Sequence, residues 1–470
     1  MKPLTKAEWA LPYLAAASVT CVALAGLRAP VLSDEVFSLE VSGQSWVSMM
    51  GALRSDVHPP LYYSALSGWF RLLPANEACL RVFSAMWLAL AVAILWRLAR
   101  DRAGELAAAA AVAVLLSNAE VLLMAGYGRM YTMLLCATVA AIAASDAVRR
   151  RPDARGPALG LAAIVAAGLL THHWFIFVLP ALAAGGVALL LPLSAGGAIY
   201  GVLWGDAAMA QLAGRAQHLA WLKRPGWESL FEVLVTHLWI LTAASPLLLA
   251  LVAMRKRAAE RVELGWKAAL GAAALSLALP LAISQWKPVF NPRFTVIIAP
   301  WLALALAGLV ARAGRAGLGL LLAAGCGWAL LDPVIAGPCN SRTAAQILAE
   351  KARPGDTVVF ARLSRKPVEW YWKDDGVRRT SFPSSTDAHP GYEGKTDAAE
   401  LRREAERLAR EAPGRVFVLA DTAAEASAIL LRALGESRRE TRPACLECAN
   451  ASKHYFNQLR VFETTTGTQP

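Results

Sequence analysis

Acids, histidines and arginines gather at the ends of apolar segments along this 470-residue chain. The clusters are 33-SDE-35, 54-RSDVH-58, 76-NEACLR-81, 118-NAE-120, 126-GYGRMY-131, 171-THH-173 and 285-QWKPVFNPRF-294. Carboxylates and imidazoles can accept a proton from a reacting group, and a guanidinium group matches the oxygens of a phosphate. Ionisable residues at membrane depth are costly and are therefore functional candidates. We interpret these clusters as parts of one active site.

The composition is that of a membrane protein. Hydrophobic residues make up 56% and charged residues 17% of the chain, and the mean hydropathy is +0.42. A soluble domain rarely has so apolar an average. The net charge of +12 comes from short basic clusters at 97–102, 148–155, 255–257 and 312–315. Such clusters between apolar segments are typical of loops on the cytoplasmic side, and no nucleic-acid motif accompanies them, so we expect no nucleic-acid partner.

Eleven apolar segments are candidate spans, since a membrane helix needs about 20 apolar residues. They are 9–31, 78–97, 103–119, 127–147, 157–171, 173–192, 195–205, 229–253, 265–284, 294–311 and 315–335. Ala23-Leu24-Ala25 could be a signal-peptidase site, but we interpret the first segment as an uncleaved span. A cytoplasmic N-terminus then places every basic cluster inside and the acid, His and Arg clusters outside. The prediction is a multi-pass protein of the inner or plasma membrane.

Segment 59–73 is predicted to lie in the membrane interface. At helical spacing, Tyr62, Leu66 and Trp69 share one side, and Ser64, Ser67 and Arg71 share the other. A spanning helix here would place the later basic clusters outside. We therefore expect an amphipathic helix, started by Pro59, in an outer loop at 32–77.

A change of composition marks a second domain. Charged helices are predicted at 397–411 and 423–436, and short apolar strands at 356–360 and 415–420. We predict a membrane domain at 1–338 and an outer α/β domain at 339–470, of ordinary domain size. Cys339, Cys445 and Cys448 are expected to include a disulfide, because one CxxC motif supplies too few ligands for zinc.

The Asp34-Glu35 pair followed by 56-DVHPPLYY-63 resembles the polyprenyl-phosphate-dependent glycosyltransferases of the GT-C fold. The nearest resemblance is to glycosyltransferase family 39, which includes protein O-mannosyltransferases and the aminoarabinose transferase of lipid A. The patterns E-x-x-x-R-x-x-S at 77–84, G-R-M-Y at 128–131 and P-R-F at 292–294 are similar to pieces of those enzymes. The resemblance covers residues 1–335. Many relatives carry Arg-Tyr where this chain has Arg293-Phe294, so that Tyr hydroxyl is absent.

The resemblance implies transfer of a sugar from a polyprenyl phosphate to an acceptor hydroxyl, with inversion. Asp34 is the expected base, ionised at neutral pH because a free Asp titrates near ~3.9. Glu35 could orient the acceptor, bind a metal or pair with Arg81. His58 could hydrogen-bond the leaving phosphate or hold Asp34, and Asp56 could contact substrate or be a turn acid.

Phosphate contacts are expected mainly from Arg129 and Arg293, each at the outer end of a span. Either arginine could instead reach lipid headgroups. The weaker substrate-binding candidates are Tyr62, Arg81, Tyr131, His172 and Lys287. The acceptor could be a lipid, a glycan or a protein.

A lipid-linked sugar phosphate already has a good leaving group, so no cofactor is required, although the acid pair could bind a divalent metal. A lipid transporter or flippase is one alternative, but it would place charges near the midplane within internal repeats. A glycan ligase or polymerase of a different fold is another, and a non-catalytic relative is a third.

Overall fold

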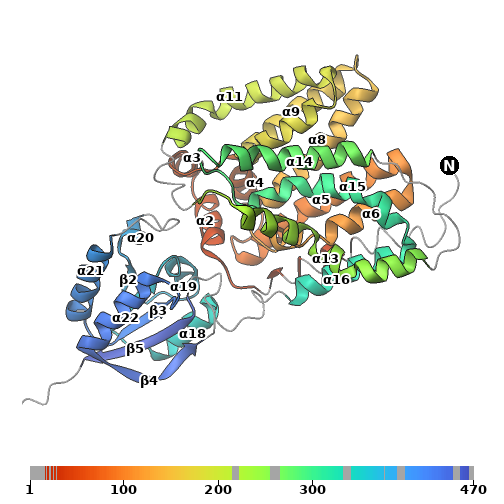
Figure 1. Cartoon of the computed structure of the whole chain (residues 1–470). Helices are drawn as coiled ribbons and strands as arrows, with labels where there is room; N and C mark the ends of the chain where they lie inside the picture. Colours follow the sequence, from red (N-terminus) through yellow and green to blue (C-terminus); the bar gives the residue numbers. More distant parts are fainter. Residues whose placement is uncertain are drawn as a thin grey trace, which may run out of the picture. The chain divides into compact units, whose positions relative to one another are not determined.

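The computed structural model divides the chain into two compact units (Figure 1). The first comprises residues 1–27 and 41–331, and the second comprises residues 28–40 and 332–470. The structure describes residues 16, 18–20, 23–24, 26–27, 29–213, 222–253, 265–331, 340–374, 376–388, 397–447 and 456–464. The predicted first span, 9–31, and the basic cluster at 255–257 therefore lie largely or wholly outside the described residues.

The first unit is helical. Its longer helices are α5 (Glu77–Ala103), α6 (Glu105–Leu116), α8 (Tyr131–Arg150), α9 (Arg155–Thr171), α11 (Leu190–Ala213), α13 (Trp227–Ala253), α14 (Trp266–Ile283), α15 (Ala299–Ala311) and α16 (Gly314–Leu331). Shorter pieces are α7 (Ala119–Ala125), η1 (His173–Val178), α10 (Leu179–Ala183), η2 (Val187–Leu189) and η3 (Pro292–Ile298). Within the described ranges, six helical segments are long and apolar enough to cross a membrane. The count of eleven spans is therefore not confirmed.

The predicted boundary between spans 173–192 and 195–205 is wrong. Residues 173–183 form the short pieces η1 and α10, and α11 then continues without a break from Leu190 to Ala213. Gly185 and Gly186 separate the two, with Gly186 at φ 131°, a conformation that favours glycine. The glycine pair therefore marks the break, seven residues before the predicted end of the earlier span.

Helices α6 and α7 form a pair bent by 69°. The bend falls at Ser117-Asn118, where the Asn118 side chain accepts a hydrogen bond from Val121 N–H and caps α7. Ser and Asn favour caps over helix interiors because their side chains bond the nearby backbone. The polar pair thus breaks an otherwise apolar segment and, if both helices are counted as one span, gives a seventh crossing.

Two short helices precede α5 in the first unit. The predicted helix at 59–73 is shorter than expected, as α4 (Leu61–Phe70), and packs against α5 and α9. Tyr62, Tyr63 and Leu66 are fully buried, so this helix is part of the protein core. Helix α3 (Trp46–Ser55) was not predicted; the Ser45 side chain caps it by accepting from Ser48 N–H.

The second unit contains a five-stranded mixed sheet in the order β2-β1-β3-β5-β4. The strands are β1 (Thr357–Ala361), β2 (Arg378–Phe382), β3 (Val416–Ala420), β4 (Arg438–Glu447) and β5 (Gln458–Thr464). β1 pairs in parallel with β2 and β3, while β5 runs antiparallel to β3 and β4. β1 and β3 are buried along their whole length, as expected of parallel strands covered on both faces.

Helices cover both faces of this sheet. One face packs against α18 (Ser341–Lys351) and α19 (Arg365–Tyr371) through a core that includes Phe360 and Phe417. The other packs against α21 (Ala398–Glu411) and α22 (Glu425–Ser437) through a core that includes Val359 and Val418. Neighbouring residues of β1 and β3 thus point to opposite faces, with the period of two expected of a strand.

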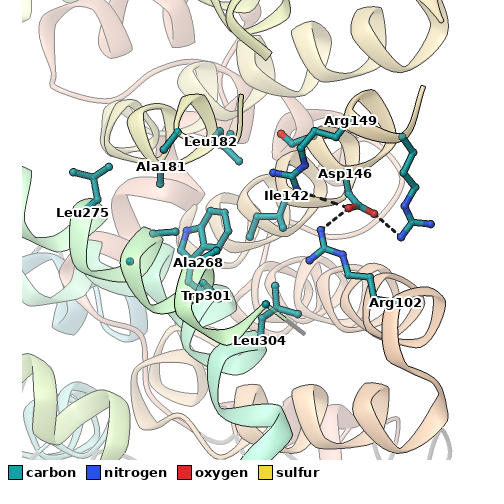
Figure 2. Close-up of a pocket in the computed structure, with 18 of the residues that line it drawn as sticks. Arg102, Ile142, Asp146, Arg149, Ala181, Leu182, Ala268, Leu275, Trp301 and Leu304 are labelled. Atoms are coloured by element: carbon teal, nitrogen blue, oxygen red, sulfur yellow. Dashed lines mark hydrogen bonds and ion pairs between the residues drawn. The ribbon is translucent and has the colours of Figure 1, made fainter. Parts of the chain in front are cut away.

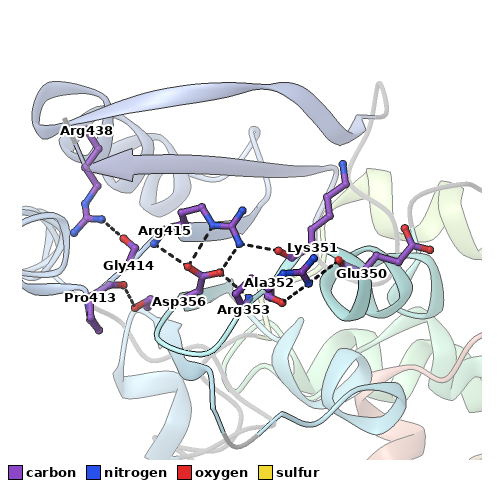
Figure 3. A network of polar contacts seen from close by, with 10 residues as sticks. Glu350, Lys351, Ala352, Arg353, Asp356, Pro413, Gly414, Arg415 and Arg438 are labelled. Atoms are coloured by element: carbon purple, nitrogen blue, oxygen red, sulfur yellow. Dashed lines mark hydrogen bonds and ion pairs between the residues drawn. The ribbon is translucent and has the colours of Figure 1, made fainter. Parts of the chain in front are cut away.

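Asp356 anchors the start of β1 in this unit (Figure 3). Its buried carboxylate accepts hydrogen bonds from the backbone N–H groups of Arg353 (2.8 Å) and Arg415 (3.0 Å). The Arg415 guanidinium adds two more, at 2.8 and 3.3 Å, and also donates to Lys351 O. The charge is therefore paired and fully hydrogen-bonded, which makes its burial tolerable.

Arg438, at the start of β4, closes the end of α21, and Figure 3 shows its contact with Gly414. Its guanidinium donates to the carbonyl oxygens of Ala409, Ala412 and Gly414. Burial lowers the pKa of Arg438, but the carbonyls at a helix C-terminus favour a cation. This arginine therefore joins β4 to α21.

An early segment of the chain completes the second unit. Residues 28–40 belong to it, including most of α2 (Ser33–Ser42). Val31 N–H donates to the Tyr371 hydroxyl at 2.8 Å, and Lys366 Nζ lies 3.0 Å from Glu40 Oε1. The disulfide predicted among Cys339, Cys445 and Cys448 lies outside the side chains that the structure describes.

Candidate active site

His58 and Arg129 meet in the first unit although 71 residues separate them. Arg129 lies between α7 and α8 and is 3% exposed, and its NH2 group lies 2.6 Å from His58 Nε2. A guanidinium group can only donate. Nε2 must therefore carry no proton in this contact, so His58 is neutral with its proton on Nδ1. A buried arginine is thus held in place by a neutral acceptor.

The remaining polar part of the 56–63 motif surrounds His58. Asp56 caps the C-terminus of α3, and its Oδ2 lies 3.8 Å from His58 Nε2. The Tyr63 ring stacks on the imidazole at 6.0 Å, and Tyr62 packs edge-on against Tyr63 at 5.3 Å. Because Tyr62 is fully buried, its position favours support of the motif over direct contact with a large substrate.

An aromatic cluster lies next to Arg129 and brings Arg293 to the same region. The Tyr127 ring stacks on Tyr131 at 6.1 Å, and the Arg293 guanidinium carbon lies 5.9 Å from the centre of the Tyr127 ring. Arg129 N–H donates to Tyr127 O at 2.7 Å. The two predicted phosphate-binding arginines are therefore joined through a single residue, Tyr127, which the sequence analysis did not select.

His172 and Phe294 extend this aromatic cluster. The His172 ring lies 6.0 Å from the Tyr131 ring and 4.9 Å from the Phe294 ring, and Phe294 also lies 6.2 Å from Tyr131. His172 accepts from Trp174 N–H and so fixes the turn between α9 and η1. Phe294, where many relatives carry Tyr, is thus a packing residue among the predicted site residues.

His237 is a further buried residue that supports this region, and the sequence analysis missed it. It lies on α13, and its Nδ1 and Nε2 contact Asn118 Nδ2 and Thr295 Oγ1, each at 2.9 Å. Thr295 in turn donates to Pro292 O at 2.6 Å. The imidazole therefore ties the α6–α7 bend to η3, which carries Arg293. A lone His within an apolar segment was the available signal.

Arg81, His173 and Lys287 lie outside the network around Arg129 and Arg293 that is described above. Arg81 is 1% exposed and donates to Gly26 O at 2.8 Å, which joins α5 to the chain at Gly26. His173 contacts Gln211 at 3.0 Å and Tyr200 at 2.9 Å. Lys287 is exposed after α14, and no hydrogen bond or ion pair of its ammonium group occurs among the described residues. Lys287 is thus not brought to the arginine cluster by any described contact.

Asp34 and Glu35 lie in the first turn of α2, among the residues of the second unit. Glu35 is 1% exposed, and its Oε2 accepts from Leu32 N–H at 3.0 Å. This is the reach of a residue at the third helical position back to the helix start. Asp34 is partly exposed one position earlier, where a negative charge is favoured by the helix dipole. The acid pair therefore divides into a buried capping residue and a more accessible carboxylate.

The cluster offers donors for an anion. Arg129 and Arg293 supply positive charge, while His58 Nδ1 and His172 Nε2 are the imidazole nitrogen atoms left to carry N–H groups, and phosphate oxygens are acceptors. Among the described residues, no group of three or more His, Cys, Asp or Glu side chains could hold a metal ion. The two arginines and the imidazole N–H groups are therefore donors suited to the oxygen atoms of a phosphate.

Comparison with known proteins identifies the fold. No protein-family model matches the sequence, and no curated protein matches it. The structure of ArnT from Cupriavidus metallidurans bound to undecaprenyl phosphate is 13% identical, with a TM-score of 0.57 over 98% of this chain and 99% of that one. The apo state of the same protein is 14% identical, with a TM-score of 0.58 over 97% of this chain and 98% of that one. An Archaeoglobus fulgidus oligosaccharyltransferase, in complex with zinc and sulfate, is 12% identical. Its TM-score is 0.37 over 85% of this chain and 67% of that one.

The chain therefore has a GT-C-like glycosyltransferase fold, as the sequence resemblance predicted. The similarity to ArnT extends over nearly the whole length of both chains. Together with the apolar helices, it identifies a multi-pass membrane protein. At 13–14% identity the likeness establishes the fold, and the reaction must be argued from the residues.

Proposed function

We propose that this protein is a membrane glycosyltransferase that moves a sugar from a polyprenyl-phosphate-linked donor to an acceptor hydroxyl. The observation that carries the proposal is the His58–Arg129 contact, with Arg293 joined to Arg129 through Tyr127. Arg129 lies between α7 and α8 and Arg293 lies on η3, so arginines from two different segments of the chain contact the same Tyr127. A guanidinium group has five N–H donors for several acceptors, and phosphate oxygens are acceptors that match its planar fork.

In the proposed reaction, Arg129 and Arg293 bind the donor phosphate and stabilise the charge that develops as it leaves. The bond from the sugar C1 to the phosphate oxygen breaks, and a bond from C1 to the acceptor oxygen forms. The electron pair of the breaking bond goes to the polyprenyl phosphate. His58 keeps Arg129 oriented by accepting its hydrogen bond. No redox or nucleotide cofactor is needed for this exchange.

Asp34 is the proposed base. It removes the acceptor proton as the new bond forms, in a single displacement that inverts C1. The support is the Asp-Glu motif together with the partly exposed position of Asp34 in the first turn of α2. Glu35 is proposed to act through the helix start, because its carboxylate already accepts from Leu32 N–H. Treatment with a chelator tests whether a divalent cation acts at this acid pair.

The sidedness follows from charge. Arg102, Arg149 and Arg150 lie at one end of α5 and α8, whereas Arg81 and Tyr131 lie at the other end of the same helices. Basic clusters favour the cytoplasmic side. We therefore propose that the arginine cluster around His58 is at the outer face of the cell membrane and that the N-terminus is cytoplasmic.

The test is transfer of radiolabelled sugar from polyprenyl-phosphate donors by the purified full-length protein. The variant Arg129→Gln is compared with the variant Arg97→Gln. Arg97 is an exposed arginine near the C-terminal end of α5, away from the candidate site. We expect transfer by the wild type and by Arg97→Gln and its loss in Arg129→Gln. Absence of transfer with every donor, alongside movement of lipid between the leaflets of liposomes, would contradict the proposal in favour of a flippase.

A further inference from the structure

A cavity with a cluster of arginines on one wall lies far from the candidate active site, in the first unit (Figure 2). Its volume is about 790 Å³, and it is enclosed by the ends of α5 and α8, by α10, and by α14 and α15. α8 extends from Tyr131 in the candidate site to Arg150 at this cavity. At 1.5 Å per residue, those two residues are about 29 Å apart along the helix. The cavity is thus separate from the proposed transfer site.

One wall of the cavity carries a cluster of arginines around a single carboxylate (Figure 2). Asp146 lies 2.7 Å from Arg102, 2.8 Å from Arg150 and 3.7 Å from Arg149. Asp101, which pairs with Arg97 at 2.7 Å, also lines the cavity, so three lining guanidinium groups face two lining carboxylates and leave an excess of one positive charge. Each guanidinium has five N–H donors, so most of their donors are not used by Asp146. This wall can therefore accept a further anion.

Two buried donors on the cavity wall point to the same ligand chemistry. Ser145 Oγ and Trp301 Nε1 belong to side chains that are 1% and 8% exposed, and both residues line the cavity. Neither atom has a hydrogen-bond partner among the described residues. A buried donor without a partner costs about 1–3 kcal/mol. A ligand oxygen that reached either atom would relieve that cost.

The other wall is apolar and shaped by small residues. It includes Leu182, Leu275 and Leu304, with Gly271 and Ala272 on α14 between them. A Cβ atom added at Gly271 would meet nothing within 4 Å, so this part of the wall borders open space. Pockets of about 300–1,000 Å³ bind drug-sized ligands. The volume of this cavity falls in that range, so it can hold a ligand much larger than one phosphate.

We propose that this cavity binds an anionic glycerophospholipid, with the headgroup phosphate on Arg149 and Arg150 and part of an acyl chain along α14. Four of the lining elements are long and apolar enough to cross a membrane, namely α5, α8, α14 and the segment formed by η3 and α15. Their ends therefore lie at headgroup depth. Basic pockets between membrane helices on the cytoplasmic side recognise such headgroups. A soluble phosphate shares the charge chemistry but would leave the apolar wall uncovered.

Lipid binding to the purified full-length protein tests the proposal. Native mass spectrometry would compare phosphatidylglycerol with phosphatidylcholine of the same acyl chains, and calorimetry would measure binding of inorganic phosphate alone. The double variant Arg149→Gln/Arg150→Gln removes two charges and leaves Arg102 on Asp146. Gly271→Phe fills the apolar side and leaves the arginines in place. The control is Arg315→Gln, an exposed arginine that does not line the cavity.

We expect the wild type and Arg315→Gln to prefer phosphatidylglycerol at least about tenfold. The double variant should lose about tenfold or more in that affinity, since each basic residue near a membrane surface contributes about 1 kcal/mol. Gly271→Phe should weaken both lipids. Equal affinity for the two lipids, or unchanged phosphatidylglycerol binding in both variants, would overturn the proposal. So would inorganic phosphate binding as tightly as phosphatidylglycerol.

Discussion

His237 Nε2 lies 2.9 Å from Thr295 Oγ1, and this contact joins α13 to the 3₁₀ helix η3 that carries Arg293. On the other side of the ring, Nδ1 lies 2.9 Å from the Asn118 amide at the α6–α7 bend. Because an Asn NH₂ group donates, Nδ1 accepts and Nε2 carries the proton given to Thr295. The position of one proposed phosphate-binding arginine therefore depends on a buried imidazole that makes no contact with it in this network.

Replacing His237 should reduce stability and donor binding together. His237→Ala leaves the Asn118 amide and the Thr295 hydroxyl without their partner and opens a cavity, and we expect a loss of about 2–4 kcal/mol. The apparent KM for the lipid-linked donor should rise while Asp34-dependent turnover persists. Thermal unfolding and donor titration measure the two effects. His237→Gln, which can keep one hydrogen bond, should lie between, and an unchanged melting temperature in His237→Ala would refute the structural role.

Arg129 should not be replaceable by lysine. Lysine keeps the charge but lacks the planar fork that can hold His58 Nε2 and a phosphate at once. We expect Arg129→Lys to lower kcat/KM for the donor about tenfold or more, and Arg129→Gln about a hundredfold. Steady-state kinetics with purified protein measures these effects. Arg97→Gln removes one positive charge, as Arg129→Gln does, and is the control for that variant. Full activity in Arg129→Lys would mean that only net charge matters at this position.

Asp34 and Glu35 should fail in different ways. Asp34→Asn removes the proposed base and should lower turnover about 10²–10⁴-fold, at a stability cost of at most about 1 kcal/mol from the lost helix-dipole interaction. Glu35→Ala removes the acceptor of Leu32 N–H and should cost about 1 kcal/mol, whereas Glu35→Gln keeps an acceptor. Transfer assays and thermal unfolding on the three variants separate chemistry from capping. If Asp34→Asn retained transfer and Glu35→Gln lost it, the base would be Glu35.

The Asp356 network should set the stability of the second unit. Asp356→Ala leaves the Arg415 guanidinium and two backbone N–H groups without their acceptor, and a loss of about 3–5 kcal/mol is expected for a broken buried pair. Hydrogen exchange of β1 and β3 should accelerate. The control is Glu406→Ala, which removes an exposed pair with Arg410 at 4.0 Å and should change stability little. Equal protection in both variants would show that the network is dispensable.

Two adjacent glycines on α11 offer a matched packing test. A Cβ at Gly196 would lie 2.6 Å from Ala162 O and from Val165 Cβ on α9, whereas one at Gly197 would meet nothing within 4 Å. Small residues allow membrane helices to approach closely. Gly196→Ala should therefore lower the melting temperature by several degrees, and Gly197→Ala should leave it unchanged or raise it. Similar behaviour of the two variants in thermal unfolding would argue against close packing of α9 and α11.

Much of the helical pattern could be predicted because apolar segments and basic clusters report directly on burial and on charge. The breaks were harder. Asn118 ends a helix only because its side chain can cap the next one, and α3 starts from a Ser45 cap within a mixed segment. The join between residues 173–183 and α11 was misplaced because Gly185-Gly186 resembles an ordinary pair of small residues in an apolar segment.

The candidate site was only partly predictable. His58 and Arg129 were predicted as site residues from their residue types and motifs. Their direct contact became visible only in the folded structure. Tyr127 and His237 were missed because aromatic and imidazole side chains in apolar segments usually serve the core. The role of Asp34 stays a prediction, as does the count of eleven spans.

The composition of the second unit has a consequence for how the chain is made. Residues 28–40 belong with partners that follow residue 340, including Tyr371 and Lys366. At about 5–20 residues per second, the ribosome takes roughly 15–60 s to add those 300 or so residues. During that interval the early segment waits without Tyr371 or Lys366. A C-terminal fragment beginning at residue 340 would lack the same segment, and adding a peptide of residues 28–42 should restore the missing contacts.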